Sequence, residues 1–198
     1  MTADTETLAA YDREAARYAE MIGDSAARDD TLAAFAKALT PGARVLDVGC
    51  GPGHAAAFLA AQGFAVDAID ASRGMAQIAR EAYGIEVTRS DYSMMTDEAV
   101  YDGIWAAFSL HHAPRVEMAG NLKRLFRALK PGGLLAVTLK TGEGERRDRL
   151  GRYTTFYAED EIGLMLRTAG FKVGDVVTGT GSGLSGEESE WLMVFAHA

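Results

Sequence analysis

The sequence predicts an α/β protein with a doubly wound, mostly parallel sheet and helices on both faces. From residue 44 onward, short apolar segments alternate with helical segments, and such alternation is typical of parallel βαβ units. A glycine-rich turn follows the first of these apolar segments, and doubly wound sheets bind their ligands at such turns. The length of 198 residues suits a single domain.

Apolar periodicity and turn residues define the expected elements. Two helices come first, at residues 5–22 and 27–39, and Pro41-Gly42 ends them. The expected strands are 44–48, 64–69, 85–88, 101–108, 134–139, 171–177 and 191–196. The expected helices between them are 53–62, 72–83, 114–129 and 160–169, with a sharp turn at Lys130–Gly133. We treat 1–198 as one domain, in which 1–40 form a helical cap and 41–198 the core.

Three glycines lie between the first strand and its helix, in the stretch VLDVGCGPGH. Gly49, Gly51 and Gly53 permit positive φ and close approach of a ligand to the backbone, beside the free N–H groups of a helix. A nicotinamide-binding fingerprint would need a glycine at His54. A nicotinamide oxidoreductase is therefore disfavoured, and a purely structural turn is the alternative interpretation.

Aspartates occur at the ends of three successive strands: Asp47, Asp70 and Asp91, the last followed by Tyr92. An acid at the position of Asp70 can accept hydrogen bonds from ribose hydroxyls. Any one of these residues is also a common turn or cap residue. Their shared placement predicts that all three converge on one crevice.

Five segments together resemble class I S-adenosylmethionine-dependent methyltransferases over residues 40–197: VLDVGCGPG, VDAIDAS, RSDY, YDGIWAAFSLHH and LKRLFRALKPGGLLAVT. Among small-molecule enzymes of this family, the chain most resembles the TehB-like and ubiquinone-biosynthesis-like branches. The resemblance implies a Rossmann-like, seven-stranded sheet with an antiparallel last strand, and S-adenosyl-L-methionine as the cofactor.

The resemblance also implies roles for individual residues. The glycine loop would hold the methionine part of the cofactor, and Asp47 would orient its amino end. Asp70, with Ala71 beside it, would bind the ribose, and Asp91 with Tyr92 the adenine. The implied cofactor-binding residues are Asp47, Gly49, Cys50, Gly51, Gly53, Asp70, Ala71, Asp91, Tyr92 and Tyr18.

The methyl acceptor is expected to be a small molecule. Families that methylate bases of nucleic acids carry an Asn-Pro-Pro-Tyr type sequence where this chain has residues 101–114, and no such sequence is present. The net charge of -8 also opposes binding to a nucleic acid backbone. A non-catalytic S-adenosylmethionine-binding module that acts through a partner remains the alternative.

Methyl transfer is a direct displacement, so alignment of the reactants and exclusion of water supply most of the rate. A base is optional. His111 and His112 follow the fourth strand and are the candidates for it. Alternatively, this pair fixes the turn or packs against the cofactor. We expect His54 to have a packing role.

Two flanking segments are expected to border the site. Tyr11 and Tyr18 lie seven residues apart on one face of the first helix, where they form either a lid over the cofactor or a core stripe. The segment 140–161 is a predicted polar loop beside the acceptor, and 178–190 a flexible hairpin turn. The arginines of the polar loop would clamp an anionic group or lie on a solvated surface: Arg146, Arg147, Arg149 and Arg152.

Composition limits the remaining classes. Cys50 is the single cysteine, so neither an internal disulfide nor a cysteine metal cluster is expected, and we predict a small buried group there. The first 21 residues are acidic and amphipathic, unlike a signal peptide. We therefore expect a cytoplasmic protein that binds no membrane and no metal. The sequence does not predict its oligomeric state.

Overall fold

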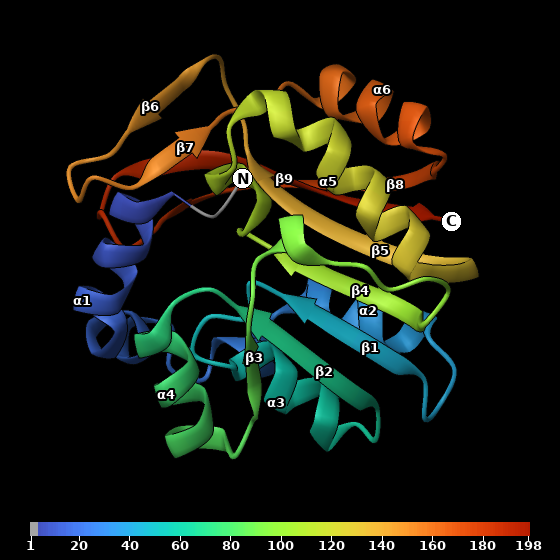
Figure 1. Ribbon diagram of the computed structural model, residues 1–198, viewed down its shortest axis with the longest axis horizontal. Helices are drawn as coiled ribbons and strands as arrows, with labels where there is room; N and C mark the ends of the chain where they lie inside the picture. The colour runs from blue at the N-terminus through green and yellow to red at the C-terminus, as the bar shows by residue number, and fades with distance from the viewer. Residues whose placement is uncertain (1–3) are drawn as a thin grey trace.

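The computed structural model describes residues 4–198 and contains one seven-stranded sheet and one small two-stranded sheet (Figure 1). The strand order of the large sheet is β3-β2-β1-β4-β5-β9-β8. Its strands are β1 Arg44–Val48, β2 Ala65–Asp70, β3 Val87–Arg89, β4 Tyr101–Ala107, β5 Leu129–Lys140, β8 Lys172–Ser182 and β9 Glu188–His197. The strands from β3 to β5 pair in parallel, whereas β9 pairs antiparallel with both β5 and β8. This confirms the predicted mostly parallel sheet with an antiparallel last strand.

Helices cover both faces of the sheet. The α-helices are α1 Thr5–Ile22, α2 Asp30–Ala38, α3 His54–Ala61, α4 Arg73–Tyr83, α5 Arg115–Ala128 and α6 Glu159–Ala169, and short 3₁₀ helices are η1 Ser25–Arg28, η2 Tyr92–Met94 and η3 Leu110–His112. On one face, α5 and α6 bury an apolar cluster that includes Leu122 and Leu166. On the other face, Phe35 of α2 packs on Trp105 of β4 in a second cluster. Burial of these side chains holds the strand ends that carry the site.

Three predictions about where elements begin or turn were wrong. The helix expected at 27–39 begins only at Asp30, because Asp29 caps it by accepting from the N–H groups of Thr31 and Leu32. The third strand begins two residues late, at Val87. The sharp turn expected at 130–133 lies inside β5, where a register shift relative to β4 accommodates the irregularity.

The two segments expected to be loops contain strands. Within 140–161, β6 Glu145–Arg147 pairs with β7 Tyr153–Thr155. Within 178–190, the β8–β9 hairpin leaves only 183–187 outside its strands. A Cβ on Gly179 would lie 2.4 Å from Trp191, so this glycine makes room for the indole across the strand pair.

Helix α1 crosses the carboxyl ends of the strands and is fixed near its middle and near its start. Asp12 accepts hydrogen bonds from the Ser72 hydroxyl at 2.6 Å and the Gly74 N–H at 2.9 Å, at the start of α4. In the first turn of α1, the Thr7 hydroxyl accepts from the N–H of Tyr153 in β7 at 2.8 Å. The helix therefore spans the distance from α4 to the β6–β7 hairpin.

None of the helices in residues 4–198 combines the length and the apolar character that crossing a membrane requires.

Candidate functional site

The glycine turn after β1 has the backbone that the sequence predicted. Gly49, Gly51 and Gly53 all have positive φ, at +69°, +55° and +83°. A Cβ on Gly49 would lie 2.4 Å from the Ser109 Cβ, and a Cβ on Gly53 would lie 2.8 Å from the Ala79 Cβ. A Cβ on Gly51 would meet nothing closer than the Tyr18 ring, at 3.7 Å. Gly49 and Gly53 thus allow close packing against Ser109 and Ala79. Gly51 instead lines the first cavity, at an ordinary contact distance from Tyr18.

Asp70 is fixed at the end of β2 by the same turn. One carboxylate oxygen accepts from the Gly51 N–H at 2.8 Å, and the other accepts from the Ser72 N–H at 2.8 Å. Burial raises the pKa of this carboxyl, and the two backbone N–H groups oppose the increase. Because a carboxylate oxygen has more than one acceptor position, each oxygen can accept a further hydrogen bond from a ligand.

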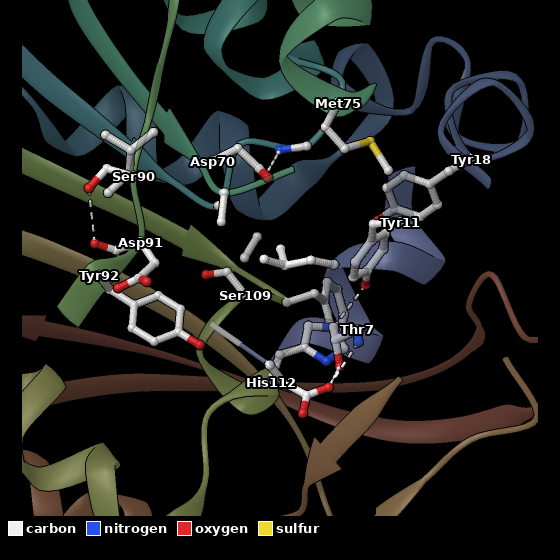
Figure 2. Close-up of a pocket in the computed structure, with 18 residues that line it drawn as sticks. Thr7, Tyr11, Tyr18, Asp70, Met75, Ser90, Asp91, Tyr92, Ser109 and His112 are labelled. Carbon is white, nitrogen blue, oxygen red and sulfur yellow. Dashed lines mark hydrogen bonds between the residues drawn. The ribbon is translucent and has the colours of Figure 1, made fainter. Parts of the chain in front are cut away.

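A first cavity of about 90 Å³ lies over the ends of β2, β3 and β4 (Figure 2). Asp70, Asp91 and Tyr92 line one side of it, and Tyr11 and His112 line the other (Figure 2). Asp91 also caps η2, where it accepts from the Ser93 N–H at 2.7 Å. Further lining residues are Ala71 and Met75 from the Asp70 side and Asp4, Thr7, Leu8 and Tyr18 from α1 and its cap.

A second cavity of about 560 Å³ adjoins the first. The two share the lining residues Tyr18, Gly49, Ala107 and Phe108. Asp47, Cys50, His54 and Arg28 line only the second. The prediction of one crevice for three aspartates was therefore wrong: Asp70 and Asp91 line the first cavity, whereas Asp47 lines only the second.

Asp47 is a buried acid with spare hydrogen-bonding capacity. Its Oδ2 atom has no hydrogen-bond partner among the described residues. Burial, together with the nearby charge of Asp70, raises the pKa of Asp47 to about 7. A cationic group in the second cavity would favour its ionised form.

Cys50 is buried, whereas His54 is partly exposed and lines the second cavity. The Cys50 side chain is 3% exposed, and burial raises the pKa of its thiol, so it remains a thiol. Burial lowers the pKa of His54, whose Nδ1 atom has no partner among the described residues.

The two candidate histidines differ in position. His112 lines the first cavity, with Nε2 2.8 Å from the Tyr11 hydroxyl and Nδ1 2.5 Å from the Tyr153 carbonyl oxygen. His111 is 2% exposed and lines neither the first nor the second cavity. Its ring packs between His112 and Phe108. Of the pair, only His112 is placed to face a ligand.

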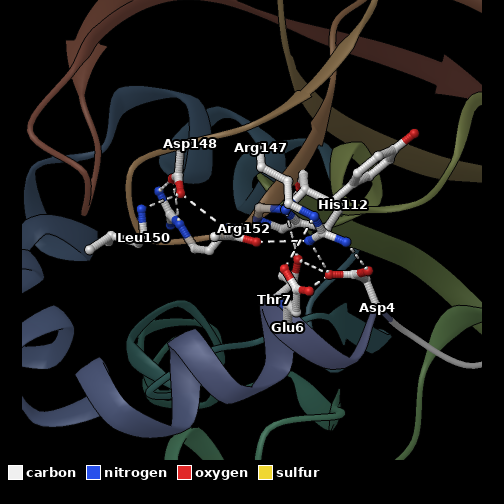
Figure 3. Close-up of polar contacts among 10 residues, drawn as sticks. Asp4, Glu6, Thr7, His112, Arg147, Asp148, Leu150 and Arg152 are labelled. Carbon is white, nitrogen blue, oxygen red and sulfur yellow. Dashed lines mark hydrogen bonds and ion pairs between the residues drawn. The ribbon is translucent and has the colours of Figure 1, made fainter.

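Two of the four loop arginines are paired with protein carboxylates (Figure 3). Arg147 forms ion pairs with Asp4 at 2.8 Å and Glu6 at 3.2 Å, both near the start of α1. Arg152 is 4% exposed and pairs with Asp148 at 2.6 Å. Arg146 lies over the Phe156 ring, and the Arg149 guanidinium lies against Gly186. The four side chains therefore do not converge on one anion.

Sequence reasoning missed Thr7, Ser109 and Phe108 as lining residues. The buried Ser109 hydroxyl has no partner within residues 4–198. Phe108 has a φ of +53°, a conformation that non-glycine residues seldom adopt and that is common near functional sites. No local sequence signal marks these positions, although Ser109 and Phe108 directly follow β4, where a ligand site is expected.

Comparison with known proteins agrees with this geometry. Residues 45–133 match the family model described as "Methyltransferase domain". The chain is 33% identical over 144 residues to trans-aconitate 2-methyltransferase of Methylobacterium nodulans, covering 71% of this chain and 55% of the relative. It is 35% identical over 120 residues to an S-adenosyl-L-methionine-dependent Diels-Alderase, iccD, of Talaromyces variabilis, and this alignment covers 56% of this chain and 39% of the relative.

Among solved structures, the Burkholderia thailandensis 1,6-didemethyltoxoflavin-N1-methyltransferase with bound S-adenosylhomocysteine aligns with a TM-score of 0.74. The identity is 23%, and the alignment covers 100% of this chain and 91% of that one. The chain spans roughly two-fifths to three-fifths of the length of the first curated relatives it matches. Residues 45–133 are therefore identified as a methyltransferase domain of the class I S-adenosylmethionine-dependent type, and the whole chain shares the fold of the Burkholderia enzyme.

Proposed function

We propose that this protein transfers a methyl group from S-adenosylmethionine to a small-molecule acceptor. The observation that carries the proposal is the joint placement of Gly51 and Asp70. Gly51 leaves its side of the cavity open, while its N–H fixes the carboxylate that faces the same space. A ribose with two hydroxyls fits a carboxylate held in this way.

The residues fit the cofactor from one cavity to the other. Asp70 and Ala71 would bind its ribose, and Asp91 and Tyr92 its adenine. Gly49, Cys50, Gly51 and Gly53 would lie along the methionine part, whose ammonium Asp47 would neutralise in the second cavity. The shared boundary at Tyr18, Gly49, Ala107 and Phe108 is where the cofactor would pass between cavities.

When bound, the cofactor supplies a methyl group on a positively charged sulfur. The chain's own residues contribute alignment and a dry site. Side chains of α1 lie over the first cavity, and Phe108 separates it from the second. Holding two reactants in register can supply a large part of the rate of a displacement.

The cap formed by residues 1–40 acts as a lid in this proposal. The first cavity, of about 90 Å³, is smaller than the roughly 300 Å³ of an ordinary ligand pocket. Thr7, Leu8 and Tyr11 of α1 line it, so α1 has to move outward to admit a nucleoside. We propose that α1 closes again over the bound cofactor.

The nature of the acceptor follows from charge and from the relatives. The net charge of -8 supports a small molecule over a nucleic acid. Names of relatives include enzymes for trans-aconitate and for a toxoflavin precursor, and we propose an acceptor of similar size for this chain. A cytoplasmic location remains a prediction from composition.

The test is a methyl-transfer assay with labelled S-adenosylmethionine on fractionated extracts, combined with calorimetric titration of S-adenosylhomocysteine. We expect binding in the calorimeter and label in a small-molecule fraction. Binding without transfer to any fraction would favour the non-catalytic module. Absence of binding would contradict the proposal.

A further inference from the structure

Tyr11 and His112 line the α1 side of the first cavity (Figure 2), and Arg152, buried behind them, completes a chain of three hydrogen-bonding groups. The Tyr11 hydroxyl lies 2.8 Å from His112 Nε2, and Arg152 donates to the same hydroxyl from Nη1 at 2.9 Å. The three residues come from α1, η3 and the β6–β7 connection. What this chain can offer to an acceptor depends on the direction of each hydrogen bond.

The direction is set by the backbone carbonyl of Tyr153, which can only accept. His112 Nδ1 lies 2.5 Å from this oxygen and must therefore carry the hydrogen. Burial lowers the pKa of His112 to about 4, so the imidazole is neutral at pH 7 and its Nε2 has no hydrogen. Nε2 is consequently an acceptor, and the Tyr11 O–H donates to it.

Tyr11 is then left with acceptor capacity alone. Its hydrogen is directed to His112, and one lone pair accepts from Arg152. A phenolic oxygen has two lone pairs, so one remains for a ligand.

Arg152 offers little to an anion at this position. Its Nε and Nη2 atoms donate to one oxygen of Asp148 at 2.8 and 2.6 Å, and its side chain is buried. Its Nη1 atom donates to Tyr11. A carboxylate placed beside Tyr11 would face a lone pair and a guanidinium whose charge is already paired, and both disfavour it.

We propose that the methyl acceptor is a molecule whose reacting oxygen or nitrogen carries a hydrogen, that it binds on the Tyr11 side of the first cavity, across from the Asp70 side that takes the ribose, and that Tyr11 accepts this hydrogen in a hydrogen bond. This inference rests on the proposed function and specifies its substrate class. Tyr11 is a catalytic residue in this scheme, and His112 is a positioning residue that acts through it.

The arrangement also provides a path for the proton. The heteroatom's lone pair forms the bond to the methyl carbon, and the electron pair of the broken carbon–sulfur bond stays on sulfur. The heteroatom's proton moves to the Tyr11 oxygen, while the Tyr11 proton moves to His112 Nε2. The products are a neutral methylated molecule, a neutral tyrosine and an imidazolium, so charge and atoms balance. His112 is a weak base, and it suffices because the heteroatom becomes strongly acidic as it gains the methyl group.

The first test measures the tautomer directly and needs no activity. The full chain with ¹⁵N-labelled histidine is examined by long-range proton–nitrogen NMR at pH 7, with and without S-adenosylhomocysteine. His112→Asn assigns the signals of His112. We expect hydrogen on Nδ1, a bare Nε2, and a shift of the Nε2 resonance in Tyr11→Phe. Hydrogen on Nε2 in the unchanged chain would overturn the inference, since Tyr11 would then be free to donate.

The second test measures transfer from labelled S-adenosylmethionine to matched pairs of compounds, for example 4-methylphenol against 4-methylbenzoate and N–H heterocycles against their carboxylates. We expect transfer to the O–H and N–H members. Tyr11→Phe should lower kcat/KM for them about 100-fold, the range of a lost proton-transfer group, and leave S-adenosylhomocysteine binding within a few-fold of the unchanged chain. Tyr83→Phe, at an exposed tyrosine of α4, is the control.

Preferential methylation of carboxylates, or equal rates in Tyr11→Phe and Tyr83→Phe, would overturn the inference and leave the proposed function standing. Binding of S-adenosylhomocysteine with no transfer to any compound or extract fraction would contradict the proposed function itself, and this inference with it. If Tyr11→Phe fails to fold, the tautomer of the unchanged chain still decides between the two outcomes.

Discussion

The two sides of the first cavity are built in different ways. The Asp70 side consists of short turns that follow β1, β2 and β3, and its key contact joins Gly51, in the turn after β1, to Asp70 at the end of the neighbouring strand β2. The Tyr11 side joins α1 to residues more than 100 positions away: Tyr11 meets both His112 and Arg152. The first side depends on local backbone geometry, whereas the second depends on how distant elements pack. Mutations should therefore affect the two sides differently.

The largest effect is expected at Asp70. Asp70→Ala removes the proposed acceptor of two ribose hydrogen bonds, and each hydrogen bond to a charged group contributes roughly 1.5–3 kcal/mol. The Kd for S-adenosylhomocysteine should rise at least about 100-fold, since 1.4 kcal/mol is tenfold. Calorimetric titration measures this. The control is Asp67→Ala. Asp67 lies on the same strand as Asp70, and its exposed carboxylate pairs with Arg44 of the neighbouring strand. Equal Kd values for both variants would contradict the assignment.

The next effect concerns the turn itself. Gly49→Ala would place a Cβ 2.4 Å from the Ser109 Cβ, whereas Gly63→Ala at φ +89° has nothing within 4 Å. Both substitutions place an alanine at positive φ and so cost a similar conformational free energy. The difference between their free energies of unfolding therefore reports the clash with Ser109 alone. Overpacking costs about 1–3 kcal/mol, and Gly49→Ala should lower the free energy of unfolding by that much more than Gly63→Ala. Chemical denaturation measures both. Equal losses would mean that the turn relaxes away from Ser109.

A pH dependence of cofactor binding is expected from Asp47. Its pKa is raised to about 7, so lowering the pH from 7.5 to 6 protonates it and removes the charge that, in the proposed binding mode, faces the methionine ammonium. Binding should weaken roughly tenfold over this interval, as linkage between protonation and binding requires. Asp47→Asn should bind with a flat profile. An unchanged slope in Asp47→Asn would place the ammonium elsewhere.

The smallest effect is expected where α1 meets the β6–β7 hairpin. Arg147→Ala removes the ion pairs with Asp4 and Glu6, and exposed pairs contribute about 0.2–1 kcal/mol. Loss of this energy increases the population of molecules in which α1 is locally open. Proteolytic cleavage within residues 1–40 should therefore accelerate about two- to fivefold. Arg146→Ala, on the same strand, is the control because Arg146 stacks on Phe156 instead.

The same assay tests the lid. Saturating S-adenosylhomocysteine should slow cleavage within residues 1–40 of the unchanged chain, because α1 would close over the ligand. A cleavage rate that does not change on addition of the ligand would contradict the closing movement.

Much of the fold followed from the pattern of the chain. Alternating strands and helices predicted the sheet, and the glycine run predicted a left-handed turn that Gly49, Gly51 and Gly53 confirm. The misses lie where tertiary contacts override local preference. Glycines at 179 and 181 suggested a flexible turn, yet they pair with β9, because Trp191 needs the space beside Gly179. The β6–β7 hairpin was hidden in a charged segment whose arginines and acids pair across the structure.

By itself, the sequence determined the sheet, the shape of the glycine turn and the acid at Asp70, because each depends on residues close together in the chain. Only the tertiary structure decided that Asp47 belongs to a second cavity, that His112 faces the first cavity while His111 is buried, and that Tyr11 is held as an acceptor. These features arise from packing between distant segments, where one carbonyl of Tyr153 fixes the hydrogen of His112 and so the role of Tyr11.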